Sequence, residues 1–170
     1  MSPARARIIH LFIAVMVVLA DRWSKRLVAA HIRMYAHIQI IPRFFQITHT
    51  ENTGAAFSLF ADSQAHWKTG LLIAFSVIAM IIVTALLWKQ QRPLTLSGIA
   101  LSLILGGAVG NLWDRVASGR VVDFLLFYVR QYEWPVFNLA DSAIVVGASL
   151  LVLEILFQKT APEPQRGHGD

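Results

Sequence analysis

The sequence lacks cysteine and is poor in charge. None of its 170 residues is Cys, which excludes disulfides, thiolate nucleophiles and cysteine-bound metals. Only 15% of the residues are charged, against about 25% in an ordinary soluble domain, whereas 56% are hydrophobic. The 15 Lys and Arg residues form no long basic run, so the net charge of +5 does not indicate a nucleic-acid partner. These shortages together predict an integral membrane protein.

Four stretches are long and apolar enough to cross a bilayer as helices. A membrane core of about 30 Å needs about 20 helical residues. The predicted spans are residues 8–27, 69–88, 94–113 and 136–157. The first is interpreted as an uncleaved anchor rather than a cleaved signal peptide, since Asp21 and Lys25 continue at helical spacing beyond its apolar part. The expected fold class is an all-α membrane protein.

The segments between the spans differ in character. Residues 28–66 contain IQIIPRFFQITHT, whose β-branched and aromatic residues predict a small extracytoplasmic β element between the first and second spans. Residues 115–135 are interpreted as a longer loop, and the Pro- and Gly-rich tail, 159–170, as disordered. The chain, 1–170, is thus expected to be a single membrane domain. Its orientation stays open, because Lys and Arg lie on both sides of the predicted spans.

Polar residues gather where four antiparallel spans would meet at one membrane face. These residues are Asp21, Lys25, Asn111, Asp114, Arg115, Asp123, Asn138 and Asp141. A charged group at the bilayer centre costs about 2.5 to 3.5 kcal/mol on insertion scales, so a cluster of them suggests a wet pocket. Some of these residues can also be explained as structural ion pairs or as a helix cap. Asp21 and Lys25 form an i, i+4 pair. Asp114 can pair with Arg115 or another base, and Asn138 can cap the fourth helix.

Asp123 and Asp141 are harder to explain in that way. Asp123 interrupts the apolar run VVDFLLFYV, and Asp141 has no basic residue three or four positions away in its own helix. Two carboxyls within a few ångströms of each other cannot both ionise, so one keeps a proton and their titrations couple. Such a pair supplies a general base and a general acid at one pH, as hydrolysis of an amide by water requires. The two residues are therefore a candidate dyad.

Other functions have weaker support. The Ser and His residues show no catalytic or metal-binding spacing, and no metal is expected, with a carboxylate-bound Mg²⁺ as the open alternative. A proton- or ion-coupled transporter normally needs acids near mid-bilayer and often inverted repeats, which are not seen here. A non-catalytic assembly factor would depend on helix packing through small residues and leave the aspartates replaceable. Packing pairs of this kind are Gly106 with Gly110 and Ala143 with Gly147.

Five blocks of sequence resemble the bacterial lipoprotein signal peptidases, or signal peptidase II, a family of four-span aspartyl proteases of the cytoplasmic membrane. They are DRWSK at 21–25, NTGAAFS at 52–58, GGAVGNLWDR at 106–115, VVDF at 121–124 and FNLADS at 137–142. Each block is weak alone, but together and in this order they are specific. The resemblance implies that Asp123 and Asp141 are catalytic. It also implies that Asp21, Lys25, Asn52, Gly54, Asn111, Asp114, Arg115 and Asn138 shape or support the site.

The resemblance further implies a substrate and an orientation. The substrate would be a prolipoprotein bearing a diacylglyceryl-modified cysteine, cut just before that cysteine without a cofactor. Membrane phospholipid is the other expected partner, and the protein is expected to be a monomer. The termini would be cytoplasmic and the site would lie at the outer face of the inner membrane. Asn52 and Asn138 are expected to donate hydrogen bonds to substrate or to the dyad, and Gly54 to permit close approach or a positive φ.

Overall fold

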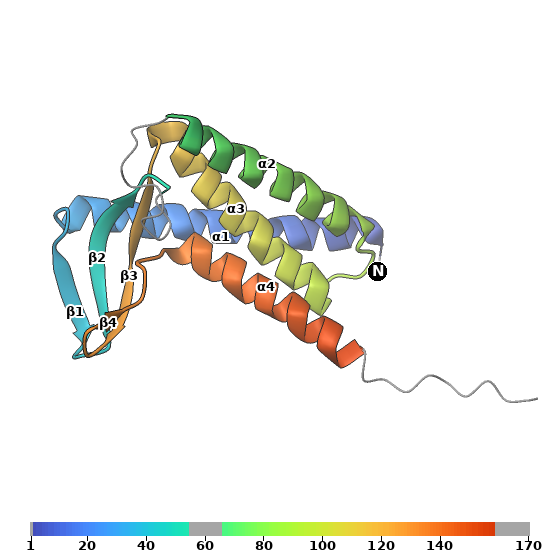
Figure 1. Cartoon of the computed structure of the whole chain (residues 1–170). Coiled ribbons are helices and arrows are strands. Elements are labelled where there is room, and N and C mark those ends of the chain that lie inside the picture. Colours follow the sequence, from blue (N-terminus) through green and yellow to red (C-terminus); the bar gives the residue numbers. More distant parts are fainter. Residues whose placement is uncertain (1, 55–65, 159–170) are drawn as a thin grey trace, which may run out of the picture.

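The computed structural model describes residues 2–54 and 66–158. Its elements are α1 (Pro3–His31), β1 (His37–Ile41), β2 (Phe45–Asn52), α2 (His66–Lys89), α3 (Leu96–Ser118), β3 (Val121–Val129), β4 (Tyr132–Glu133) and α4 (Leu139–Gln158). The helices form a bundle, and the sheet lies at the end of the bundle opposite the start of α1 (Figure 1). The predicted fold class, four long helices with a small β element, is confirmed. The tail from residue 159 and most of the NTGAAFS block lie outside the described residues.

All four helices in the described part of the chain are long and apolar enough to cross a membrane. Half of the spanning part of α3 is buried, against 11% to 17% in the other three, because α3 packs against α1, α2 and α4. Small residues allow this close packing. A Cβ on Gly106 would lie 2.7 Å from the carbonyl oxygen of Ala14, and one on Gly147 would lie 2.6 Å from that of Ala100. Gly106 therefore admits α1, and Gly147 brings α4 against α3.

Local signals set the ends of α3. The helix begins at Leu96 rather than at residue 94, because Leu94 has φ +58° and the Thr95 hydroxyl caps the helix by accepting a hydrogen bond from the Gly98 amide at 3.0 Å. It ends where Gly119 adopts a left-handed conformation at φ +74°. The helix therefore extends beyond the predicted span and carries Asp114 near its last turn.

The sheet has the order β1-β2-β3-β4, and each neighbouring pair is antiparallel. Its second half comes from the chain between the third and fourth helices. The interpretation of residues 115–135 as a loop was wrong, because this segment completes α3 and forms β3 and β4. The run VVDFLLFYV is partly covered on both faces and therefore lacks the strict polar alternation that marks a half-exposed strand.

Two contacts fix the sheet to the bundle. Buried Phe124 of β3 packs with Val28 and Ile32 at the end of α1. The segment before α4 is held by main-chain hydrogen bonds, because the Phe137 carbonyl accepts from the amides of Phe124 at 2.9 Å and Leu125 at 2.8 Å. The start of α4 is thus fixed beside the strand that carries Asp123.

Candidate active site

A buried lysine organises the polar residues at the sheet end of the bundle. Its ammonium group contacts Asp21 Oδ2 at 2.8 Å, Asp114 Oδ2 at 2.7 Å and Asn111 Oδ1 at 3.1 Å. The side chain of Lys25 is only 3% exposed. The contacts with Asp21 and Asn111 are hydrogen bonds, whereas the contact with Asp114 Oδ2 is an ion pair without a hydrogen bond. Lys25 therefore joins α1 to α3 and neutralises part of the carboxylate charge that the fold buries.

Asp21 and Asp114 each have a second partner. Asp21 Oδ1 accepts a hydrogen bond from the Ala140 amide at 3.0 Å, so a side chain of α1 satisfies a free N–H in the first turn of α4. Asp114 accepts from the Arg22 guanidinium. The predicted Asp21–Lys25 ion pair is present, whereas the partners of Asp114 are Arg22 and Lys25 rather than Arg115.

The absence of a side chain at Gly110 makes room for this cluster. A Cβ at that position would lie 2.7 Å from Asp21 Oδ2. Gly110, like Gly106, therefore faces α1, and the GxxxG pair of the sequence serves the α1–α3 contact as well as the polar network.

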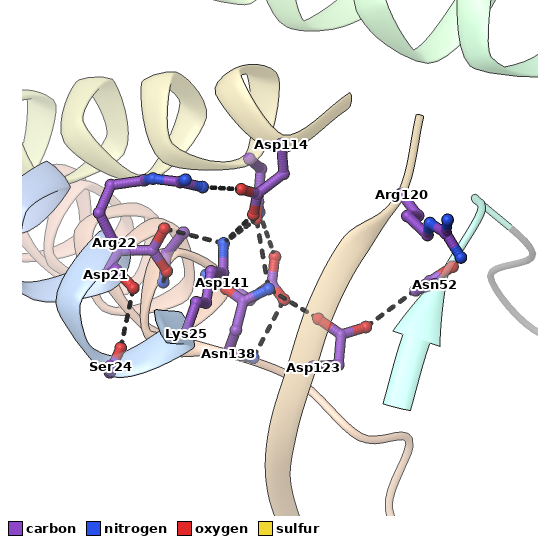
Figure 2. Close-up of polar contacts among 12 residues, drawn as sticks. Asp21, Arg22, Ser24, Lys25, Asn52, Asp114, Arg120, Asp123, Asn138 and Asp141 are labelled. Atoms are coloured by element: carbon purple, nitrogen blue, oxygen red, sulfur yellow. Dashed lines mark hydrogen bonds and ion pairs between the residues drawn. The ribbon is translucent and has the colours of Figure 1, made fainter. Parts of the chain in front are cut away.

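Two asparagines, Asn111 and Asn138, connect Lys25 to the sheet through hydrogen bonds. Figure 2 shows Asn138 joined to Asp123. The Lys25 cation requires the oxygen of the Asn111 side chain, so the Asn111 amide nitrogen points at Asp141 and donates to its Oδ1 at 2.7 Å. The Asn138 amide nitrogen donates to Asn111 Oδ1 at 3.2 Å and to Asp123 Oδ1 at 2.7 Å. The orientation of both amides thus follows from one buried charge.

Asn138 also caps α4, as its sequence position suggested. Its side-chain oxygen accepts from the Asp141 amide at 2.9 Å, and Asp141 Oδ2 accepts from the Asn138 amide at 3.3 Å. This reciprocal pair has the form of a capping box. The side-chain oxygen and backbone amide of Asn138 form the cap, whereas its side-chain nitrogen binds Asp123. Asn138 is therefore both a helix cap and a residue of the site.

Asp123 is held on both oxygens. Its Oδ2 accepts from the Asn52 side chain at 3.1 Å, while Oδ1 accepts from Asn138. Asn52 itself accepts from the Gly54 amide at 2.8 Å, and Gly54 adopts φ +98°, the positive φ that the sequence suggested. The last residue of β2 therefore presents its amide to the carboxylate on β3 (Figure 2). Next to this point, β2 has a register shift between Ile47 and Thr50 opposite β3.

Asp123 and Asp141, the two candidate catalytic carboxylates, are both hydrogen-bonded to Asn138. Within the described part of the chain, neither has an ion pair, and no hydrogen bond joins them directly. They interact through charge: the pKa of the Asp123 carboxyl is raised from 3.8 to about 6, mainly by burial and then by the negative charge of Asp141. Hydrogen bonds from Asn52 and Asn138 oppose this increase. Asp123 is 3% exposed, whereas Asp141 is half-buried, so Asp141 is the more accessible of the two.

Arg115 lies close enough for its charge to act on this pair. Its interaction with Asp141 is larger than that with Asp123 or Asp114. The guanidinium makes no hydrogen bond or ion pair with a side chain that the structure describes. Arg115 is half-buried, and among residues 2–54 and 66–158 it has no ion-pair partner.

The structure thus brings all ten sequence-predicted site residues into one region, nine of them in or next to a continuous hydrogen-bond network and Arg115 by charge alone. Sequence reasoning missed Arg22, because its partner Asp114 is far away along the chain and only the packing of α1 on α3 joins them. It also missed the Phe137 carbonyl, which positions α4 against β3. Among residues 2–54 and 66–158, no three His, Asp or Glu side chains gather to hold a metal ion.

Comparisons with known proteins agree on one family. The family model described as signal peptidase (SPase) II matches residues 13–157. The lipoprotein signal peptidase of Solibacter usitatus is 44% identical over 147 residues, which is 86% of this chain and 90% of that protein. The lipoprotein signal peptidase of Pseudomonas aeruginosa strain UCBPP-PA14 is 41% identical over 162 residues, 95% of each chain.

Solved structures are similar along almost the whole chain. A structure described as a bacterial membrane enzyme, obtained by the in meso method at 2.3 Å resolution, aligns with a TM-score of 0.78 at 28% identity. The alignment covers 95% of this chain and 93% of that one. A second structure of the same description, at 1.9 Å resolution, gives 0.77 at 31% identity and covers 86% of this chain and 92% of that one. The fold and the sequence therefore point to the same group of proteins.

Proposed function

This chain belongs to the signal peptidase II family, and from that premise we propose that Asp123 and Asp141 cut the signal peptide from prolipoproteins just before a diacylglyceryl-modified cysteine. Family membership makes the protein a peptidase of the bacterial inner membrane that acts on lipoproteins. The observation that carries the assignment of the two aspartates is their electrostatic coupling on either side of Asn138.

In this mechanism Asp123 carries the proton in the reacting form. Burial, and then the nearby charge of Asp141, raise the pKa of Asp123 to about 6, so the protonated form predominates below that pH and is the minor form near pH 7. Asp141, half-buried and accepting hydrogen bonds on both oxygens, acts as the carboxylate base. Asp141 takes a proton from water as the water oxygen attacks the scissile carbonyl, and the Asp123 O–H supports the developing oxyanion. The proton taken by Asp141 then passes to the leaving nitrogen as the C–N bond breaks.

The remaining network has a positioning role in this proposal. Asn111, itself held by Lys25, fixes Asp141. Asp123 is fixed by Asn138 and, from β2, by Asn52. A preorganised arrangement of this kind needs little reorganisation during the reaction. In this proposal the Arg115 guanidinium, whose charge interacts with those of Asp141 and Asp123, binds substrate carbonyl oxygens. No step in the proposal needs a cofactor, and the absence of one stays a prediction.

The diacylglyceryl group is expected to contribute most of the substrate positioning. The site lies where the helices meet the sheet, so acyl chains can stay in lipid while the scissile amide reaches the carboxylates (Figure 1). We predict that a precursor lacking the diacylglyceryl group is cleaved with a kcat/KM lower by about 10²-fold or more, because the chains hold the amide in place. Purified protein, with lipidated and unlipidated forms of one precursor, gives this ratio on a gel.

Equal cleavage of the two forms would contradict the proposed substrate while leaving the peptidase activity intact. Cleavage of neither form, by protein that remains folded, would contradict the proposed function itself. The assay therefore separates an error in the substrate from an error in the reaction.

We also propose that the sheet and the carboxylates face outward and that the termini are cytoplasmic. Short basic flanks favour the cytoplasmic side, and the short α2–α3 connection carries Arg92 next to Lys89. The cysteine-free chain allows a direct check with single substitutions at exposed positions. Glu133→Cys, on β4, is expected to react with an impermeant maleimide in spheroplasts, and Gln91→Cys to react only after lysis. The reverse pattern would invert the proposed topology.

A further inference from the structure

A shallow, open groove lies along one face of α2, toward the end of the helix. That end of α2 lies beside the start of α1 (Figure 1). Its volume is about 450 Å³, and it is closer to an open surface than to an enclosed pocket, so an occupant would be covered by protein on one side only. The lining residues are Val77, Met80, Ile81, Thr84, Ala85 and Trp88. The surface is almost wholly apolar and belongs to a helix with the composition of a membrane span. None of these residues takes part in the catalytic network.

The length of the groove matches one leaflet of a bilayer. At about 1.5 Å per residue, the helix rises about 16 Å from Val77 to Trp88. This is roughly half of the hydrocarbon core of about 30 Å. Trp88 stands at the end of the helix, where tryptophan is enriched at membrane interfaces. An acyl chain with its head group at the level of Trp88 would therefore fill the groove.

A cation sits at the head-group end of the groove. The Arg7 guanidinium carbon lies 3.9 Å from the centre of the Trp88 ring. Arg7 has no ion pair with a residue that the structure describes, and its Nε is buried without a hydrogen-bond partner. A guanidinium stacked on an aromatic face keeps its N–H groups in the plane of the stack. Because Nε is buried, bidentate contact with a phosphate would be made by the two terminal nitrogens.

We propose that this groove binds one anionic phospholipid, with its phosphate on Arg7 and one acyl chain along α2. Charge complementarity selects the occupant, because Lys89 and Arg92 follow Trp88 in the chain and add positive charge to that of Arg7. The site lies in the leaflet on the side of the termini, remote from Asp123 and Asp141. It is independent of the cleavage reaction and belongs to the anchoring of the bundle in lipid.

Native mass spectrometry of the full-length protein, stripped of lipid in detergent, tests this site with phosphatidylglycerol as the probe. We expect one tightly bound molecule and about tenfold weaker binding by Arg7→Gln, the effect of losing one charge-assisted contact of about 1.4 kcal/mol. Ala85→Phe, at an exposed position in the groove, is expected to weaken binding similarly without changing charge. The matched controls are Arg5→Gln and Leu86→Phe, an exposed position outside the lining, and both should bind as the unaltered protein does.

Three further probes identify what is bound. Diacylglycerol has the chains without the phosphate and should bind about tenfold more weakly, phosphatidylcholine should bind with intermediate strength, and inorganic phosphate should not compete. Equal binding of diacylglycerol and phosphatidylglycerol would overturn the role of Arg7. Competition by inorganic phosphate would show an anion site rather than a lipid site. An equal loss with Arg5→Gln and Arg7→Gln would show general surface charge and would also overturn the proposal.

Discussion

Replacement of Asp123 or Asp141 by Asn is expected to lower the rate of precursor cleavage by about 10³-fold or more, because each variant removes one of the two groups that move protons. Asn has nearly the shape of Asp and removes a negative charge from the site. Its one acceptor oxygen keeps one of the two hydrogen bonds that each carboxylate accepts, and the removed charge offsets part of the loss of the other. Both variants should therefore insert into the membrane, purify and unfold at nearly the temperature of the unaltered protein. Initial rates on a lipidated precursor, measured with enzyme in excess, give the change in the chemical step.

The control for this prediction is Glu133→Gln, the same acid-to-amide change at an exposed residue of β4 outside the network. It should cleave at the unaltered rate. Substantial cleavage by either folded Asp variant would remove that aspartate from the mechanism. A rate that falls equally in the control would trace the loss to the sheet as a whole rather than to the two carboxylates.

Lys25→Met is expected to destabilise the protein by about 3 to 5 kcal/mol, which lowers the thermal midpoint by roughly 10 °C for a chain of this size. Methionine has a similar length but no charge. Its introduction leaves the carboxylates of Asp21 and Asp114 buried near each other, with Arg22, on Asp114, as the remaining ion-pair partner among the described residues. It also frees Asn111 to rotate, so cleavage should fall along with stability. Thermal unfolding in detergent measures the first effect.

Two further variants test whether the loss of stability comes from the buried ion network around Lys25. Arg26→Met removes a neighbouring, exposed charge and should leave the midpoint unchanged. Adding Asp21→Asn to Lys25→Met removes one of the uncompensated charges while an oxygen remains for the Ala140 amide, so part of the stability should return. An unchanged midpoint in Lys25→Met, or no recovery in the double variant, would show that the buried ion network does not hold α1 against α3.

Hydropathy was sufficient to predict the helices, because a span needs only length and apolar composition. It was not sufficient for β3. The run VVDFLLFYV pairs with β2, more than 60 residues earlier in the chain, and is covered on both faces, so nothing local distinguishes it from a buried loop. The predicted β element was therefore only the first half of the sheet.

The candidate carboxylates were predictable because each is an acid without a local base. Their connections were not. The i, i+4 pair of Asp21 and Lys25 follows from helix geometry, but the contact of Lys25 with Asp114 depends on the distance between α1 and α3. Asn138 was read either as a cap or as a site residue, whereas in three dimensions its backbone and side chain serve both purposes. Contacts of this kind require the packed fold.

The central claim is that burial, and then the negative charge of Asp141 on the other side of Asn138, raise the pKa of the Asp123 carboxyl. The direct measurement is the titration of the Asp123 carboxyl by NMR in protein labelled with ¹³C-aspartate, with the signal assigned from the spectrum of Asp123→Asn. The account predicts a midpoint of about 6 in the unaltered protein and a lower midpoint in Asp141→Asn, because that variant removes a negative charge that raises the pKa of Asp123. A midpoint near 4 in the unaltered protein, or the same midpoint in both proteins, would contradict it.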